Sequence, residues 1–293
     1  MRKTLVALVA AASLLVSAMP AAADSSQPAG PAAINPAQAS GLALDPGIAP
    51  ADASPSGQPL PRGDMPGWHQ VFADDFTSTV PIGSFPTAVS DTWSAYQNGW
   101  PDTTHNGTYM PSQVVSQHDG VLDMYIHTVG GVHMVSALLP KIPGAPGGED
   151  GLQAGRYAVR FKSDPIQGYK TAWLLWPDSG KWPADGEIDF PEGNLDGAIS
   201  AFVHHQFGSS GRDQDWYGTA ASYGGWHTAV IERTSSSVKF YLDDQLVGQS
   251  TSRLPSTAMH WVLQTETTLD GSIPSDSAAG HVLVDWVAVY TPA

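Results

Sequence analysis

The chain has 293 residues, of which only 14% are charged, and 28 acidic against 13 basic residues give it a net charge of −15. This negative balance would repel nucleic acid and anionic membranes, so we expect neither as a partner. The chain contains no cysteine. An exported fold would therefore have no disulfides and would have to rest on a sizeable core of its own.

The first 23 residues have the pattern of a secretory signal peptide. Arg2 and Lys3 precede the apolar run TLVALVAAASLLVSA, which is too short to span a bilayer and leads into an A-x-A cleavage pattern. We predict cleavage after Ala23 and a secreted, extracellular protein. The alternative, an N-terminal membrane anchor, is disfavoured because no basic stop-transfer patch follows. Cleavage would leave 11 basic against 28 acidic residues, a net charge of −17.

Residues 24–66 form a second region, with nine prolines, five charges and no aromatic residue. Such a composition buries too little apolar surface to offset the entropy lost on ordering, so it predicts a disordered linker. The last few residues of this region have a second interpretation, as a strand or helix of the domain that follows. All 27 aromatic residues lie from Gly67 onward. We therefore predict one large folded domain over residues 67–293.

Short segments of this domain alternate apolar and polar side chains with a period of two. VVSQHDGVLDMYIHTV predicts two strands joined at Asp119-Gly120, and SSVKFYLDDQLVGQS predicts a hairpin that turns at Asp243-Asp244. Single strands are predicted in GRYAVRFKS, YKTAWLLW, GAISAFVHHQF, WHTAVIERT and HVLVDWVAVY. Strands at this spacing predict an all-β fold, a two-sheet antiparallel β-sandwich.

Three acids stand close together in the segment DGEIDFPEG. Glu187 and Asp189 would share one face of a strand, whereas an ideal strand would point Glu192 to the opposite face. A β-bulge around Phe190-Pro191 would insert one residue and return Glu192 to the face of its partners. Proline is tolerated at a bulge because a ladder N–H is already lost there. The segment therefore predicts three carboxyl groups on one face.

Three carboxyls in this arrangement suit the cleavage of a glycosidic bond. A retaining glycosidase needs two carboxyl groups about 5–5.5 Å apart, one ionised to attack and one protonated to assist the leaving oxygen. Like charges at close range raise one pKa and keep that proton in place. An acidic loop or a calcium site is the alternative, but the interleaved Ile188 and Phe190 are unlike a loop. We expect no catalytic metal, because neighbouring strand residues such as His204 and His205 point to opposite faces.

The stretch AWLLWPDSGKWPADGEIDFPEG resembles the active-site segment of family 16 glycoside hydrolases, in particular the bulged branch that includes the laminarinases (endo-1,3-β-glucanases). Other segments resemble further strands of that family, so the resemblance covers nearly all of residues 68–291. They are FADDF, GLQAGRYAVRFKS, WHTAVIER, VKFYLDDQLV and VLVDWVAVY. The resemblance implies a concanavalin A-like β-jelly roll with a substrate cleft on its concave sheet. It also implies Glu187 as nucleophile, Glu192 as acid/base and Asp189 as their assistant.

Sugar rings need flat apolar platforms, and Trp173, Trp176 and Trp182 lie just upstream of the acids, although each is at least as well suited to the core. The same resemblance implies that Trp173, Trp182 and His204 face the sugar. It implies no required cofactor, although a structural calcium ion, as in some relatives, would involve Asp285 near the last strand. Phe190-Pro191 stands where laminarinases commonly carry two aliphatic residues. This departure leaves the catalytic set intact but weakens any transfer of substrate specificity.

These observations predict a secreted, retaining endo-glycosidase that acts as a monomer on a β-linked polysaccharide. The favoured substrate is 1,3-β-glucan, with galactan-type polymers as a second possibility. A carbohydrate-binding sandwich without turnover is an alternative, but it would not need three spaced acids. A cell-wall transglycosylase is another, because it would use the same site and the same intermediate.

Overall fold

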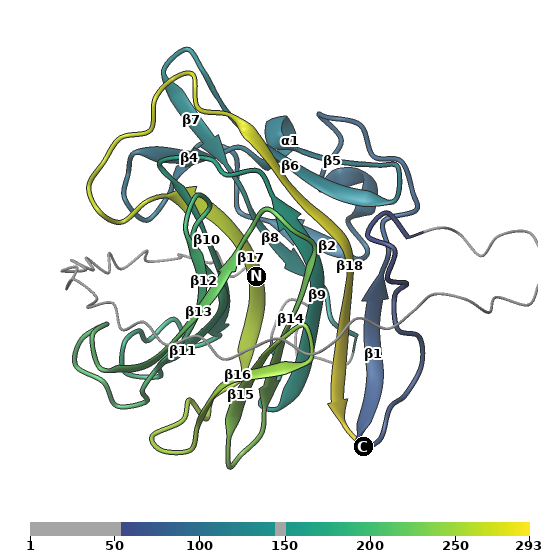
Figure 1. The fold of residues 1–293 in the computed structure, drawn as a ribbon, viewed down its shortest axis with the longest axis vertical. Coiled ribbons are helices and arrows are strands. Elements are labelled where there is room, and N and C mark those ends of the chain that lie inside the picture. Colours follow the sequence, from purple (N-terminus) through teal and green to yellow (C-terminus); the bar gives the residue numbers. More distant parts are fainter. Residues whose placement is uncertain (1–53, 144–150) are drawn as a thin grey trace, which may run out of the picture.

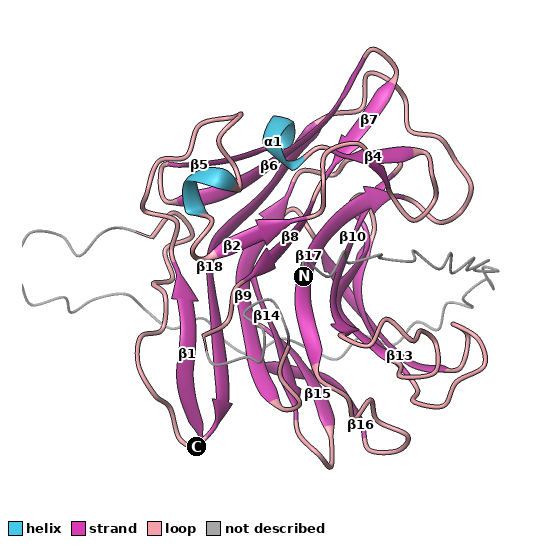
Figure 2. Ribbon diagram, turned by 180° about the vertical axis from the view of Figure 1, so that it is seen from behind, coloured by secondary structure: helices cyan, strands magenta, loops and turns pink. Residues whose placement is uncertain are grey.

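The computed structural model describes residues 54–143 and 151–293, so the predicted signal peptide and most of the predicted linker lie outside the described residues. Two β-sheets pack face to face, as the ribbon in Figure 1 shows. Helices are confined to the short α1 (Pro111–Val114) and one 3-10 turn, η1 (Thr87–Val89), among the described residues (Figure 2). The predicted two-sheet β-sandwich is confirmed. In the described part of the chain, no helix has the length and apolar character that a membrane crossing requires.

The larger sheet has eleven strands. Across the sheet they are β16 (Gln245–Ser250), β15 (Val238–Leu242), β14 (His227–Arg233), β9 (Gly155–Ser163), β18 (Gly280–Pro292), β6 (Val121–Val129), β7 (Val132–Val135), β4 (Gly107–Tyr109) and β3 (Trp100–Pro101), with β1 (Trp68–Asp74) paired to β18 and β5 (Val115–His118) to β6. Neighbours are antiparallel except β4 and β7, which run parallel. The predicted turns at Asp119-Gly120 and Asp243-Asp244 connect β5 to β6 and β15 to β16.

The smaller sheet has seven strands and carries the acidic segment in its middle. Across the sheet they are β13 (Gln214–Ser222), β12 (Ala198–His204), β11 (Glu187–Asn194), β10 (Tyr169–Pro177), β17 (Met259–Thr267), β8 (Ala137–Pro140) and β2 (Trp93–Ala95). One face of this sheet packs on the larger sheet. We call the opposite face the outer face; it carries Lys170, Trp176, Glu187, Asp189, Glu192 and His204.

The core between the two sheets is built from large side chains at alternate strand positions. Trp173 of β10 is fully buried and packs edge-on against Phe161 of β9, with ring centroids 5.1 Å apart. Phe190 of β11 meets Phe240 of β15 in the same way at 5.5 Å. Each such burial stabilises the fold by about 1.5–3 kcal/mol. The two sheets are therefore joined by aromatic contacts directly behind the acidic segment.

Residues 54–66, which composition assigned to the linker, lie against the larger sheet. Ser54 Oγ and the Ser56 amide both donate to Asp285 Oδ2, at 2.5 and 3.1 Å, and Trp286 Nε1 donates to the Gln58 carbonyl. Leu60 packs on a small apolar cluster of the same sheet. The folded domain therefore begins before Gly67. Composition misses this because the contacts come from a few serine, glutamine and backbone groups.

The contacts of Asp285 also bear on the calcium ion that the resemblance left open. Calcium is held by six to eight oxygen ligands. Here Asp285 is buried, and its Oδ2 already accepts two hydrogen bonds from the N-terminal segment. As these residues lie, they fit a hydrogen-bonded anchor and do not fit a calcium ion at that oxygen.

A chain that begins at Gly67 should be less stable than a matched chain that begins at Ser54, because it lacks these contacts. Leu60→Ala in the longer chain should reproduce part of the loss, about 1–2 kcal/mol for a partly buried leucine. Thermal unfolding followed by circular dichroism measures the difference. Equal melting temperatures for the two chains would show that residues 54–66 contribute nothing to the fold.

Candidate active site

Strand β11 contains the predicted bulge. Asp189 pairs with Phe202 of β12, whereas Glu192 pairs with Ser200, so three steps along β11 match two along its neighbour. The pairing with β10 shifts by the same one residue. One extra residue therefore lies between Asp189 and Glu192, at the Phe190-Pro191 step, as the sequence predicted.

The bulge places the three acids together on the outer face. Ile188 and Phe190 point into the core and are almost fully buried, so Glu187 and Asp189 point the other way. The inserted residue restores this orientation for Glu192. The side chains of Asp189 and Glu192 are only 3% and 11% exposed. The predicted catalytic set is thus gathered in one largely dehydrated group.

Burial and mutual repulsion raise the pKa values of two of these carboxyls, those of Glu187 and Asp189. Ligand atoms of Glu187, Asp189 and His204 lie within 4.8 Å of one another, and His204 Nε2 is 3.3 Å from Asp189 Oδ2. Burial, followed by the charge of Asp189, raises the pKa of Glu187 well above its usual value. Burial and the charge of Glu192 raise the pKa of Asp189, and Lys170 offsets part of this shift. The group therefore retains a proton at pH values where an exposed carboxyl has lost it.

A cation would also fit the spacing of Glu187, Asp189 and His204. We attribute the short distance between Glu187 and Asp189 to a proton that the two carboxyls share, because both have raised pKa values and the pair therefore retains a proton. Catalysis without a metal ion stays a prediction.

Two of the three predicted sugar-facing residues lie at this site. The ring of Trp182 stacks on Trp176 of β10, with centroids 6.3 Å apart and planes inclined by 16°, and meets His204 edge-on. Trp182 Nε1 and His204 Nδ1 are buried and have no hydrogen-bond partner among the described residues. Buried polar atoms without a partner are uncommon in folded proteins, so two of them together mark this part of the outer face as a candidate site.

The prediction for Trp173 is wrong. Its side chain is fully buried in the core, so it cannot contact a sugar on the outer face. The period of a strand puts Trp176, three residues further along, on the opposite face from Trp173. Trp176 is partly exposed and is the tryptophan of β10 that can contact a substrate.

Sequence reasoning also missed a basic and an acidic residue beside Glu192. Lys170 Nζ lies 2.5 Å from Glu192 Oε1 and 3.6 Å from Glu266 Oε1 of β17. Tyr96, next to β2, faces the same group, and burial together with Glu187 and Glu266 raises its pKa to about 12. The available signal was a single lysine inside the otherwise uncharged strand segment YKTAWLLW.

The outer face extends to the edge strand β13, where Trp216 is 62% exposed. Trp216 pairs with Phe202, and its indole lies over Gly218, where a Cβ atom would come within 2.7 Å of the ring. Only glycine leaves room for a ring in this position. Trp216 therefore offers a second flat apolar surface on the edge strand of the same sheet.

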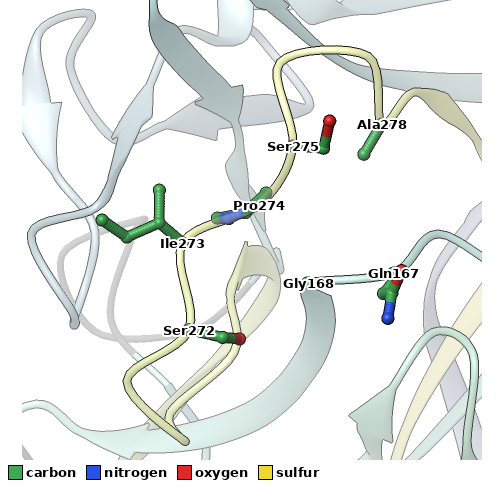
Figure 3. Close-up of a pocket in the computed structure, with 7 residues that line it drawn as sticks. All are labelled: Gln167, Gly168, Ser272, Ile273, Pro274, Ser275 and Ala278. Carbon is green, nitrogen blue, oxygen red and sulfur yellow. The ribbon is translucent and has the colours of Figure 1, made fainter.

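A separate surface pocket of about 310 Å³ lies between the loop after β9 and the loop after β17 (Figure 3). It is lined by Gln167, Gly168, Ser272, Ile273, Pro274, Ser275 and Ala278. This lining contains neither a titratable nor an aromatic side chain, so it identifies no ligand.

A β-sandwich whose outer face carries three clustered carboxyls beside stacked tryptophans has the features of a carbohydrate-active enzyme. Residues 148–288 match the sequence model of glycosyl hydrolases family 16. This match includes the acidic segment and confirms the resemblance to family 16 glycoside hydrolases that this segment predicted. A search of curated proteins gives no match.

Several solved structures share this fold. LamA from Zobellia galactanivorans, determined with laminaritriose and laminaritetraose, is 23% identical over 76% of this chain and 98% of its own, with a TM-score of 0.58. The laminarinase from Rhodothermus marinus is 20% identical over 77% of this chain and 98% of its own, with a TM-score of 0.64. A structure reported with endo-acting O-glycanases of human gut bacteria, which initiate mucin breakdown, is 19% identical over 77% of this chain and 100% of its own, with a TM-score of 0.60.

The two tryptophans of β10 should respond differently to substitution. Trp176→Ala should weaken polysaccharide binding by about tenfold and leave the melting temperature close to that of the wild type, because the ring lies on the outer face. Trp173→Ala should instead cost about 3–5 kcal/mol of stability through the cavity that it leaves. Affinity electrophoresis and thermal unfolding separate the two effects. A binding loss confined to Trp173→Ala would contradict the assignment of faces.

Proposed function

We propose that the chain is a secreted, retaining endo-glycosidase that cleaves a β-linked polysaccharide, with 1,3-β-glucan as the favoured substrate. The observation that carries this proposal is the bulge that returns Glu192 to the face of Glu187 and Asp189. Two carboxyls on one face at a separation of about 5–5.5 Å would suit a covalent intermediate. The family match supports the same chemistry.

In the first step, Glu187 attacks the anomeric carbon while the bond to the leaving oxygen breaks and Glu192 gives that oxygen its proton. In the second step, Glu192 takes a proton from water, the resulting hydroxide attacks the anomeric carbon, and Glu187 is released as a carboxylate. Asp189 holds its proton toward Glu187 and so keeps the nucleophile ionised. Burial raises the pKa of both Glu187 and Asp189, so the pair retains a proton, and the proposal assigns that proton to Asp189.

The site and the relatives support a glucan. LamA was determined with laminaritriose and laminaritetraose, and the rings of Trp176 and Trp182 offer apolar surfaces for pyranose faces. Trp216 would add a further subsite at the edge of the sheet. Galactan-type polymers remain a second substrate class, and the O-glycanase relative adds mucin-type glycans to the test.

The proposal is tested by release of new reducing ends from laminarin, mixed-linkage glucan, a galactan and mucin O-glycans. Products sized over time separate hydrolysis from transglycosylation, because a transglycosylase would lengthen some chains without net release of reducing ends. Binding without any new reducing end would point to a carbohydrate-binding sandwich. Products of intermediate size at early times would show internal cleavage.

Substitution of the two glutamates should separate their roles. Glu187→Gln should abolish turnover on every substrate, because both chemical steps use this carboxylate. Glu192→Gln should lose activity on polysaccharide but keep the first step on an aryl glycoside with an acidic phenol, which leaves without a proton. Azide should restore turnover in Glu192→Gln only, since it attacks the intermediate without a base. Near wild-type activity of Glu192→Gln on polysaccharide would refute its catalytic role.

A further inference from the structure

The outer face holds two ionisable residues, Lys170 and Glu266, that the mechanism above does not use. Lys170 of β10 lies opposite Glu266 of β17, while Glu192 pairs with Ala172, two residues further along β10 on the same face. Lys170 Nζ is 2.5 Å from Glu192 Oε1 and 3.6 Å from Glu266 Oε1. The exposed fractions of the Lys170 and Glu266 side chains are only 5% and 2%. The buried ammonium of Lys170 therefore lies beside two buried carboxyls.

This lysine is charged. Burial by itself disfavours the ammonium, but Glu192 and then Glu266 outweigh burial and raise the pKa of Lys170 above its usual value. Burial raises the pKa of Glu266, and Lys170 opposes that rise. An ammonium in such a dehydrated site is strongly destabilising if it has no carboxylate beside it.

Glu266 compensates the charge of Lys170 when the reaction neutralises Glu192. Glu192 must be neutral when it protonates the leaving oxygen and ionised when it activates water. If Lys170 were paired with Glu192 alone, it would lose its counter-ion whenever Glu192 is protonated and neutral. Glu266 keeps a carboxylate near Lys170 throughout, so the charge of Lys170 stays compensated whichever form Glu192 takes.

We propose that Lys170 and Glu266 are positioning residues that act through Glu192, fixing its carboxyl on the bulge and setting how readily it releases and regains a proton. This inference rests on the proposed function. Lys170 favours the ionised form of Glu192, and Glu266 opposes it by repulsion and by competing for the same ammonium. The balance between the two decides the upper pH limit of the first chemical step.

Other titratable groups surround the pair. On the neighbouring strands and loops these include Glu187, Asp189, His204, Tyr96, Asp102, Tyr109 and Tyr223. They remain unchanged in the variants that follow, so their contribution is the same in each comparison.

The two residues should shift the pH profile in opposite directions. In Lys170→Met, loss of the nearby positive charge makes Glu192 harder to ionise, so the alkaline limb of kcat/KM should move up by about one pH unit or more. In Glu266→Gln, loss of a negative charge makes Glu192 easier to ionise, so the same limb should move down. Lys239→Met on β15 of the other sheet is the matched control and should keep the wild-type profile.

A purely structural role would lower activity or stability in both variants without these opposite shifts. If Lys170→Met fails to fold, Lys170→Met/Glu266→Gln removes both charges together and should fold, with its alkaline limb at higher pH than that of Glu266→Gln. Unchanged profiles, or shifts of the same sign in both single variants, would overturn the proposal.

Carbon-13 NMR of protein labelled at the glutamate carboxyls gives a readout that needs no turnover. The Glu192 signal is the one that disappears in Glu192→Gln. Its titration midpoint should move to higher pH in Lys170→Met and to lower pH in Glu266→Gln. A midpoint that stays at the wild-type pH in both variants would overturn the proposal. A wild-type protein that cleaves no glycan would refute the proposed function, and the NMR titration would still decide whether this charge coupling exists.

Discussion

The site depends on one packing constraint, the insertion of Ile188 and Phe190 into the core while one extra residue separates Asp189 from Glu192. The aromatic contact between Phe190 and Phe240 anchors the strand from behind. With this anchor in place, the strand cannot rotate Glu192 back to the core face without withdrawing a buried ring. Hydrophobic packing of the strand, together with the bulge, therefore determines where the carboxyl group of Glu192 lies.

Dehydration is the second consequence of that placement. Sheet strands on both sides bury the carboxyls of β11, and burial is the largest cause of the raised pKa values of Glu187 and Asp189. A group of buried acids would destabilise the fold if it had no compensation. Lys170 supplies the compensating charge, and a shared proton removes another part of the repulsion.

The sequence predicted side-chain orientation well where apolar and polar residues alternate along a strand, and poorly where they do not. The bulge could be predicted because proline and strand parity together required an irregularity between Asp189 and Glu192. The assignment of Trp173 to the outer face came from the resemblance and was wrong. The pattern of β10 itself did not correct it, because apolar residues occupy most positions on both faces of this strand. Glu266 was hidden in the same way, because β17 is buried over most of its length. The contacts of residues 54–66 involve isolated polar groups, which leave no periodic pattern.

The stereochemistry of the first product tests the carboxyl placement most directly. Proton NMR within the first minutes of polysaccharide cleavage, before mutarotation mixes the anomers, reports the configuration at the new reducing end. Carboxyls at retaining distance give a β product, because two successive displacements occur at the anomeric carbon. An α product would mean that a water molecule fits between Glu187 and Glu192 and attacks directly, which would contradict the placement that we derive from the bulge.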